Sequence, residues 1–368
     1  MQPLSILQVA SGDLWGGAEA QVHTLCKYLA RMSTSHVEVV LLNHGELEGR
    51  LRAEGIQVHV FDEAKLGSAE IFLRLRHLLK TLQPNIIHTH RQKENILASC
   101  ANFLSIRAAC IRTQHGAPEF DYSWAQWKNK IQVTVDQFCG RYLQKKIIAV
   151  SEELAHKLQV DYPKQHITVI ENGVDLEALK DVKADAPFLL HEPKVKVKHV
   201  GIVGRLVPVK RVDIFLDMAS ELVNSESTDQ VLKFHVIGDG PLRLQLEKRA
   251  EQLGLSDAVT FHGHIKNVAS YIKSLDVLVM CSDHEGLPMT LLESMALGTP
   301  IVSHNAGAVT ESFEQGEGGV LSEEHEASSY ASALYKLLTS DSKVLPAKPN
   351  SALDNAQAII ALYREISL

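Results

Sequence analysis

The stretch SDHEGLPMTLLESMALGT, residues 282–299, decides the fold of the second half of this chain. It follows residues 276–281, a short apolar segment that predicts a buried strand. Pro288 stands where proline is favoured in the first turn of a helix, and Gly298 with Pro300 just beyond it ends that helix. A buried strand that leads at once into a helix is the repeating unit of parallel α/β sheets.

Two carboxylates flank the predicted start of this helix. Glu285 lies in the loop before it and Glu293 about a turn and a half inside it, so a rise of about 1.5 Å per residue separates them by roughly 9 Å. Between them, the backbone N–H groups near Leu287, Met289 and Thr290 are predicted to point outward at the positive end of the helix dipole. This predicts an anion site with a hydroxyl-binding carboxylate on each side, which is the layout of a nucleotide sugar.

Glu285 and Glu293 form an E-x7-E pattern, and the surrounding EGLPMTLLESMALGTPIV resembles the retaining glycosyltransferases of family 4. The resemblance extends to WGGAE (15–19), GIVGRLVPVKR (201–211), VIGDGP (236–241) and VTFHGHIKN (259–267). Five motifs in the family order are far more specific than one. The resemblance implies the GT-B fold, in which two Rossmann-like, doubly wound α/β domains face each other across a cleft. It also implies transfer of a hexose from a UDP- or GDP-sugar to a hydroxyl of a glycan or lipid-linked acceptor, as in lipopolysaccharide or other cell-surface polysaccharide biosynthesis.

Composition sets limits on partners and location. The net charge of −7 falls on one half, since residues 1–190 hold 21 basic and 21 acidic side chains whereas residues 191–368 hold 16 and 23. An acidic half argues against nucleic acid as a partner. Five scattered cysteines without a C-x-x-C pair predict reduced thiols in a cytoplasmic protein. The start, MQPLSILQVA, predicts a buried strand rather than a signal peptide, and no apolar run reaches the roughly 18 residues that cross a bilayer.

Short apolar segments alternate with helical stretches along the whole chain, which predicts parallel, doubly wound sheets. The first series has predicted strands at 4–9, 37–42, 58–61, 86–88, 109–113, 147–150 and 167–170, and helices at 18–32, 69–82 and 122–144. The second has strands at 200–203, 234–237, 259–261, 277–281 and 301–303. The poorly periodic stretch 172–198 predicts a linker. We therefore expect an N-terminal acceptor-binding domain (1–185), a C-terminal nucleotide-sugar-binding domain (186–345) and a last helix (346–368) that, by the resemblance, packs back on the first domain.

Two motifs in the first half are open to two interpretations. Gly16 and Gly17 form either a tight turn that opens a helix or, as the resemblance favours, a turn whose N–H groups approach the donor phosphate; neither a Walker loop nor the G-x-G-x-x-G fingerprint is present. His115 follows a predicted strand, at the edge where open α/β sheets bind ligands. It is either structural or, as the resemblance implies, a catalytic residue that hydrogen-bonds the sugar or phosphate. His88 and His90 end the preceding strand and are expected to face the acceptor.

In the second half, Arg205 and Lys210 are either a solvated charged turn or a clamp for a departing diphosphate, the role that the resemblance implies. Glu285 would bind a sugar hydroxyl and favour the oxocarbenium-like carbon of the transition state, and Glu293 would bind the ribose. The remaining predicted donor-binding residues come from the base-pocket loop and the helix start: Ile265, Gly286, Leu287, Pro288, Met289 and Thr290. No D-x-D metal motif is evident, so we expect neither a metal nor another cofactor beyond the nucleotide-sugar substrate. The loop 305–311 departs from the family's Gly-Gly-x-Pro-Glu pattern.

Residues 119–146 hold two tryptophans and five basic residues. This stretch is either an ordinary helix with a wet face or an amphipathic helix that makes peripheral contact with an anionic membrane.

Two other classes of enzyme share the predicted architecture. A sugar-nucleotide epimerase of the same fold would need no acceptor. An NAD-dependent oxidoreductase should show a glycine fingerprint with an acidic residue about 20 positions later, which neither half shows.

Overall fold

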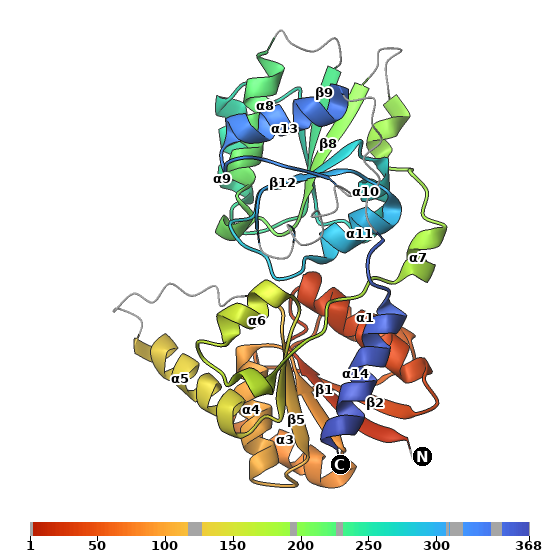
Figure 1. The fold of residues 1–368 in the computed structure, drawn as a ribbon, viewed down its shortest axis with the longest axis vertical. Helices are drawn as coiled ribbons and strands as arrows, with labels where there is room; N and C mark the ends of the chain where they lie inside the picture. The colour runs from red at the N-terminus through yellow and green to blue at the C-terminus, as the bar shows by residue number, and fades with distance from the viewer. Residues whose placement is uncertain are drawn as a thin grey trace. The chain divides into compact units, whose positions relative to one another are not determined.

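The computed structural model describes residues 3–116, 127–191, 197–225, 231–306, 309, 319–339 and 348–367. Contacts divide the chain into two compact units (Figure 1). Unit 1 comprises Met1–Gly173 and Asn350–Leu368, and unit 2 comprises Val174–Pro349. Each unit has its own parallel sheet with helices against it, as the alternation of strands and helices requires.

Unit 1 contains a seven-stranded parallel sheet with the order β3-β2-β1-β4-β5-β6-β7. Its strands are β1 Leu4–Ala10, β2 Ser35–Leu41, β3 Gln57–Val60, β4 Ile86–Thr89, β5 Ala109–Gln114, β6 Lys146–Ala149 and β7 Ile167–Val169. Its helices are α1 Gly17–Arg31, α2 Glu46–Ala53, α3 Ser68–Leu82, α4 Gln92–Phe103, α5 Trp127–Tyr142, α6 Glu152–Leu158, η1 Lys164–His166 and α14 Ala352–Ile366.

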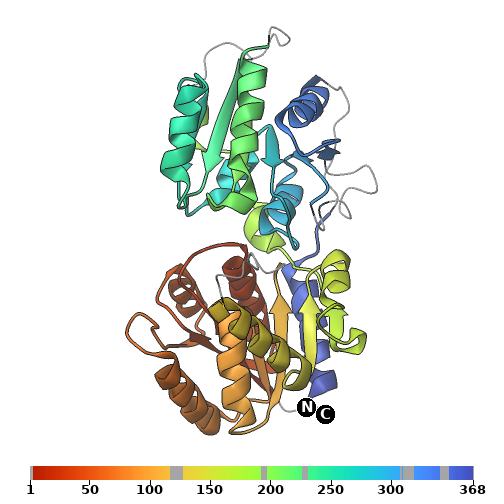
Figure 2. The same ribbon diagram turned by 90° about the vertical axis from the view of Figure 1, so that its left-hand side faces the viewer.

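Both faces of this sheet are buried, which explains why its strands are nearly continuous apolar runs. Successive side chains of β1 point to opposite faces. Ile6 packs in the cluster that includes residues of α1, α2 and α14, whereas Leu7 packs in the cluster that includes α3 and α4. The last helix therefore completes the core of the unit in which the chain begins (Figure 2).

Unit 2 contains a six-stranded parallel sheet with the order β10-β9-β8-β11-β12-β13. Its strands are β8 Val197–Val203, β9 Val231–Ile237, β10 Val259–Gly263, β11 Val277–Met280, β12 Ile301–Ser303 and β13 Gly319–Leu321. Its helices are α7 Leu176–Lys180, η2 Pro187–His191, η3 Pro208–Lys210, α8 Val212–Val223, α9 Arg243–Gln252, α10 Val268–Ser274, α11 Met289–Leu297 and α13 Ala327–Thr339.

A row of histidines crosses three neighbouring strands of unit 2. His199 Nδ1 lies 2.9 Å from His235 Nε2, and His235 Nδ1 lies 3.0 Å from His262 Nε2. Phe188 stacks on His235 with ring centroids 4.0 Å apart. Burial, followed by the neighbouring His262, His199 and Lys233, lowers the pKa of His235 to about 3. His235 is therefore neutral at physiological pH.

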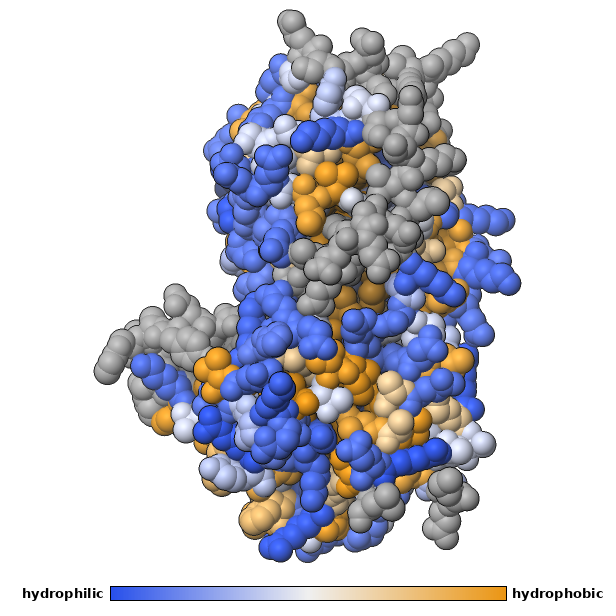
Figure 3. Space-filling model, viewed as in Figure 1, coloured by the Kyte–Doolittle hydropathy of each residue, from blue (hydrophilic) through white to orange (hydrophobic). Residues whose placement is uncertain are grey.

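One side of unit 2, formed by α8 and α9, has a mostly polar surface. On the face drawn in Figure 3, hydrophilic residues cover most of the side formed by α8 and α9. Among the described residues, no helix is both long enough and apolar enough to span a membrane.

The predicted fold class is confirmed, because both units are parallel, doubly wound α/β sheets. The boundaries differ from the prediction. The chain passes to unit 2 after Gly173 rather than after residue 185, and returns at Asn350 rather than 346. The short helix α7, which the weak periodicity of 172–198 concealed, packs against α11 and so belongs to unit 2. Strand β13 was not among the predicted strands.

Candidate active site

The strand order of unit 2 brings the predicted donor-binding loops together. The first strand in sequence, β8, lies between β9 and β11, so the strand order reverses at the β8–β11 pair. Open α/β sheets bind ligands at this switch point, beyond the carboxyl ends of the strands. The loops that carry Arg205 and Lys210 follow β8, and the loop that carries Glu285 follows β11.

Lys210 and Glu285 meet at this point. Lys210 Nζ lies 2.5 Å from Glu285 Oε1, and the two side chains are 24% and 12% exposed. The pair is thus partly shielded, with a cation and a carboxylate that can each bind another group. Sequence analysis singled out both residues for separate roles, and the structure joins them as an ion pair.

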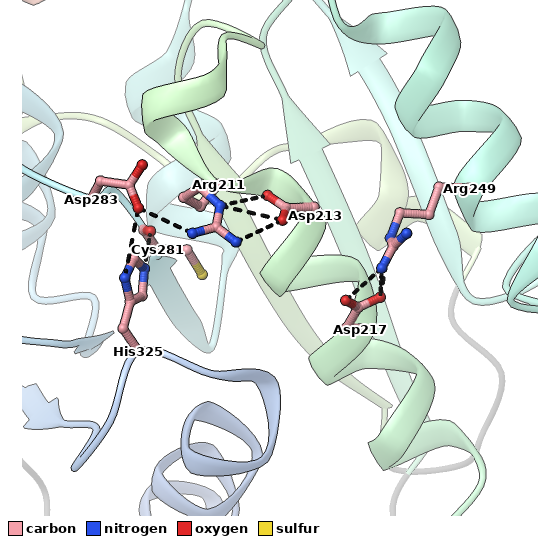
Figure 4. Close-up of polar contacts among 7 residues, drawn as sticks. All are labelled: Arg211, Asp213, Asp217, Arg249, Cys281, Asp283 and His325. Carbon is pink, nitrogen blue, oxygen red and sulfur yellow. Dashed lines mark hydrogen bonds and ion pairs between the residues drawn. The ribbon is translucent and has the colours of Figure 1, made fainter. Parts of the chain in front are cut away.

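Arg211 ties the same two loops together (Figure 4). Its guanidinium contacts Asp213 at 2.9 Å and Asp283 at 3.1 Å. Burial alone would raise the pKa of the Asp213 carboxyl, but hydrogen bonds from Arg211 hold it below its usual value. Arg211 adopts a left-handed conformation (φ 46°), which is uncommon for a residue with a side chain. The ion pairs of Arg211 therefore fix the turn that carries Lys210.

His325 supports this arrangement from the other side. Its Nε2–H donates to the backbone carbonyl of Cys281 at 2.8 Å, and its Nδ1 lies 3.7 Å from Asp283. Figure 4 also shows Arg249 with Asp217, an ion pair of 2.7 Å that joins α9 to α8 outside the site.

Helix α11 starts one residue later than predicted. Pro288 is its N-cap, with extended backbone, and Gly298 ends it in a left-handed conformation (φ 76°). Within the part of the chain that the structure describes, no side chain caps this N-terminus. Gly286, Leu287, Pro288 and Met289 are buried and Thr290 is half-buried. The positive end of the helix thus follows closely after Glu285 in the chain, and Glu293 is half-buried inside the helix.

The loops after β8 and β9 pack against each other so closely that glycine is required. Gly238 has φ 135°, and a Cβ on it would lie 1.9 Å from the carbonyl oxygen of Gly204.

The Arg205 side chain is exposed and has no ion pair with any described residue. Ile265 is half-buried in the loop after β10. Arg205 therefore offers a cation that the protein itself leaves available.

In unit 1, His115 directly follows β5 and is half-buried. Its Nε2 lies 3.1 Å from His90 Nδ1, and its Nδ1 is buried without a hydrogen-bond partner among the described residues. Burial, with the charges of Arg91 and Arg112, lowers the pKa of His115 to about 3. The ring is therefore neutral at physiological pH, and its buried Nδ1 has no hydrogen-bond partner among the described residues.

The expectation that His88 and His90 face an acceptor is wrong. His88 is fully buried and His90 is 4% exposed. His88 lies between Tyr363 and Thr113, at 2.6 and 2.7 Å. Both rings belong to a buried polar network, because a histidine inside a sheet core needs hydrogen-bond partners.

The turn with Gly16 and Gly17 is anchored on both sides. The Arg50 guanidinium lies 4.1 Å from the Trp15 ring, and buried Glu19 forms an ion pair with Arg91. Gly16 has φ −153°, which any residue can adopt. A Cβ added to Gly16 would lie 3.3 Å from the nearest atom, an oxygen of the Glu19 carboxylate. The pairing of Arg91 with Glu19 was not predicted from the sequence. The position of Arg91 just after β4 was the only feature that could have indicated a role for it.

Some predictions fall on residues that the structure does not describe. These are residues 119–126 of the proposed membrane stretch and residues 307, 308, 310 and 311 of the loop that departs from the family pattern. Over the described ranges, no group of three His, Cys, Asp or Glu side chains is placed to hold a metal ion. The cysteines are free, with Cys100 Sγ and Cys139 Sγ 3.9 Å apart.

Two sequence profiles match the chain, one over each half. The profile described as glycosyltransferase family 4 matches residues 15–178, and that of glycosyl transferases group 1 matches residues 191–356. Together with the GT-B architecture and the site in unit 2, they show that the chain belongs to the family 4 glycosyltransferases of GT-B fold. The comparisons support neither the epimerase nor the oxidoreductase alternative.

Relatives act in polysaccharide and cell-surface biosynthesis. The chain is 28% identical to the UDP-Gal:alpha-D-GlcNAc-diphosphoundecaprenol alpha-1,3-galactosyltransferase of Escherichia coli, over 74% of this chain and 70% of that protein. It is 29% identical to the Vi polysaccharide biosynthesis protein VipC/TviE of Salmonella typhi over 43% of this chain, and spans only 27% of that protein.

Among solved structures, the chain is similar to HepE of Anabaena in complex with UDP-glucose. The TM-score is 0.78 and the identity 21%, with 99% of this chain and 98% of that chain covered. At this identity, the likeness establishes the shared fold.

Proposed function

We propose that this protein is a retaining hexosyltransferase that moves a sugar from a UDP- or GDP-sugar to a hydroxyl of a glycan or lipid-linked acceptor. The observation that carries the proposal is the Lys210–Glu285 pair at the β8–β11 switch point, where the loop that carries Glu285 leads into the uncapped start of α11. A cation, a carboxylate and a helix N-terminus suit the phosphate and the hydroxyls of one ligand.

Unit 2 binds the donor in this proposal. The diphosphate rests on backbone N–H groups of Gly286, Met289 and Thr290, and Arg205 and Lys210 neutralise the charge that grows on the leaving phosphate. Preorganised groups of this kind usually supply the largest part of catalysis. Glu293 accepts from the ribose hydroxyls, and backbone near Ile265 borders the base.

Lys210 changes partner as the reaction proceeds. In the free protein its ammonium neutralises Glu285. When the donor binds, Lys210 contacts phosphate and Glu285 accepts from a sugar hydroxyl. Glu285 then lies where its charge favours an oxocarbenium-like carbon. Because these residues supply positive charge to the leaving group, we propose that the reaction needs no metal ion.

The anomeric configuration is retained in this proposal. No carboxylate is assigned as a nucleophile, so the leaving phosphate takes the proton of the acceptor hydroxyl on the face from which it departs. The C1–O bond to phosphate breaks as the C1–O bond to the acceptor forms, and the proton passes to the phosphate oxygen. In unit 1, His115 hydrogen-bonds a substrate group.

The names of relatives support a nucleotide donor and a surface-glycan product. The E. coli relative is named for UDP-Gal and an undecaprenol-linked acceptor, and HepE was crystallised with UDP-glucose. Staphylococcus aureus TarM, with 13% identity and a TM-score of 0.73, was solved with UDP and alpha-GlcNAc-glycerol. We propose a comparable role in lipopolysaccharide or another cell-surface polysaccharide.

A cytoplasmic enzyme that uses lipid-linked acceptors needs access to the membrane, and α5 supports such contact. Ile131, Phe138 and Tyr142 are 53%, 53% and 70% exposed, and their spacing places them on one side of the helix. Exposed Arg141 and Lys145 adjoin them. We propose that this surface, the α5 stripe, rests on anionic lipid.

A donor panel tests the function. Thermal-shift measurements with UDP- and GDP-sugars should give a rise in Tm with one base and one sugar, and none with NADH. The same donor should then be consumed in the presence of an acceptor and not isomerised without one. Stabilisation by NADH alone, or donor isomerisation without acceptor, would contradict the proposal.

A further inference from the structure

A continuous row of hydrogen-bonded side chains crosses the core of unit 1 and ends at His115. In order, the row consists of Thr113, His88, Tyr363, Gln8, His90 and His115. All except His115 are at most 5% exposed. Its members lie in β1, in or directly after β4 and β5, and in the last helix, α14, so distant parts of the sequence build it.

The amide of Gln8 determines which atoms donate and which accept in the hydrogen bonds of the row. Its Nε2 donates to the Tyr363 hydroxyl at 2.9 Å, and its Oε1 lies 2.8 Å from His90 Nε2. Because the Tyr363 hydroxyl accepts from Gln8, its own proton is free to be donated to another atom. It donates that proton to His88 Nδ1, which lies 2.6 Å away. His88 therefore carries its proton on Nε2, which donates to Thr113 at 2.7 Å.

The same amide fixes the two rings on its other side. Gln8 Oε1 can only accept, so His90 carries its proton on Nε2. Burial, with the nearby charges of His88, His115 and Arg91, holds the pKa of His90 well below its usual value, so the ring is neutral and its Nδ1 is an acceptor. His115 Nε2 lies 3.1 Å from that Nδ1 and must be the donor. The proton of neutral His115 is thus on Nε2.

This assignment leaves His115 Nδ1 as a lone pair with no partner among the described residues. A buried acceptor without a partner is costly, and a hydroxyl supplied by another molecule would satisfy it. A lone pair accepts from a hydroxyl and repels a phosphate oxygen, which has no proton to give.

We propose that Tyr363 and Gln8 are positioning residues that hold His115 as its Nε2–H tautomer, so that its Nδ1 accepts a hydrogen bond from a substrate hydroxyl. The inference rests on the proposed function for the identity of that substrate. It deepens that function in two ways. It selects a hydroxyl over a phosphate as the group that His115 binds, and it assigns a role to the last helix of the chain.

The tautomer can be observed directly. Long-range ¹H–¹⁵N NMR of the full chain labelled with ¹⁵N-histidine, with His115 assigned by comparison with His115→Gln, should show a protonated Nε2 and a pyridine-type Nδ1 at neutral pH. Tyr363→Phe keeps the ring and removes the hydroxyl. Since Gln8 then has no acceptor to orient it, both His115 tautomers should be populated and kcat should fall about fivefold, with little change in the KM for donor.

Gln21→Met is the matched control. Gln21 Nε2 donates to Asn355 Oδ1 on the same helix α14, at 3.1 Å, and lies outside the row. This variant loses a buried hydrogen bond of similar kind, yet its His115 signals and kcat should match those of the wild type.

Three results would overturn the inference: a protonated Nδ1 in the wild type, unchanged His115 signals in Tyr363→Phe, or an altered tautomer with unchanged kcat. The wild-type spectrum alone tests the assignment if Tyr363→Phe does not fold. If the wild type shows the expected tautomer but transfers sugar from no donor, the proposed function fails while the role of Tyr363 and Gln8 in orienting His115 stands.

Discussion

Lys210 Nζ and Glu285 Oε1 lie 2.5 Å apart although the residues are 75 positions apart in the sequence. The pair joins the loop after β8 to the loop after β11, at the place where the strand order of the sheet reverses. In the free protein each charge neutralises the other. A ligand that offers a phosphate to one and a hydroxyl to the other can replace the pair without leaving a charge buried alone.

Lys210→Ala should lower kcat about a hundredfold, because the variant loses a charge that stabilises the leaving phosphate. Steady-state kinetics with the donor found in the panel measures this. Lys248→Ala, an exposed lysine on α9, is the control and should behave as wild type. A normal kcat in Lys210→Ala would eliminate the phosphate clamp.

Glu293→Ala should raise the KM for donor about tenfold and also lower turnover, since a carboxylate bonded to ribose hydroxyls is lost. Glu293→Asp should recover part of the loss. Glu251→Ala, on the exposed side of α9, provides the comparison. The ribose assignment is untenable if donor binding to Glu293→Ala, measured by calorimetry, equals that of the wild type.

The product should retain the anomeric configuration of the donor. Proton NMR of the first product formed, recorded before mutarotation, reports this from the coupling of the anomeric proton. A product of inverted configuration would contradict the front-face mechanism and require a general base that deprotonates the acceptor.

Acidification should destabilise the protein through the histidine row of unit 2. The folded-state pKa of His235 is about 3, below the ordinary value near 6.5, so only the unfolded state binds the proton between those values. The stability is fully present above about pH 6.5, and falls by about 1.4 kcal/mol per pH unit for each such histidine as pH drops toward 3.

His235→Gln keeps hydrogen bonding without a titrating ring, and should show a smaller loss of unfolding free energy between pH 7 and pH 5 than the wild type. Urea denaturation at both pH values measures it. His156→Gln, an exposed position on α6, is the control. Equal pH dependence in His235→Gln and the wild type would show that the row does not resist protonation.

The α5 stripe should bind anionic vesicles. Wild-type protein should float with phosphatidylglycerol vesicles and stay at the bottom with phosphatidylcholine, and Ile131→Ser/Phe138→Ser/Tyr142→Ser should lose flotation. Leu73→Ser is the control, because Leu73 is 59% exposed on another helix, α3. Flotation of the triple variant would assign lipid contact to another surface, and no flotation of the wild type would reject it.

Most of the fold could be predicted because buried parallel strands are apolar on both faces and stand out in the sequence. The run at 276–281 and the helix after Pro288 were predicted to within a residue at the helix start. The boundary after Gly173 could not be predicted, since α7 has five residues and is held in unit 2 by contacts with α11 rather than by its own periodicity.

The sequence singled out candidate site residues but not the contacts between them. Lys210 and Glu285 were identified from local motifs, whereas their pairing depends on β8 lying beside β11. For His88 the local pattern was misleading, because its partner Tyr363 is 275 positions away. A buried polar residue can be interpreted only when the segment that satisfies it is known, and for His88 that segment is the last helix.

The return of the chain to unit 1 at Asn350 has a consequence for how the protein folds while the ribosome synthesises it. Unit 2 is one continuous segment, so it can fold while the chain is still being made. Unit 1 cannot complete its core until α14 has left the ribosome, and the apolar side of α1 stays uncovered until then. A nascent chain that stalls before residue 350 would thus expose the apolar surface of α1, to which chaperones can bind. It would also lack the Tyr363 hydroxyl that orients Gln8.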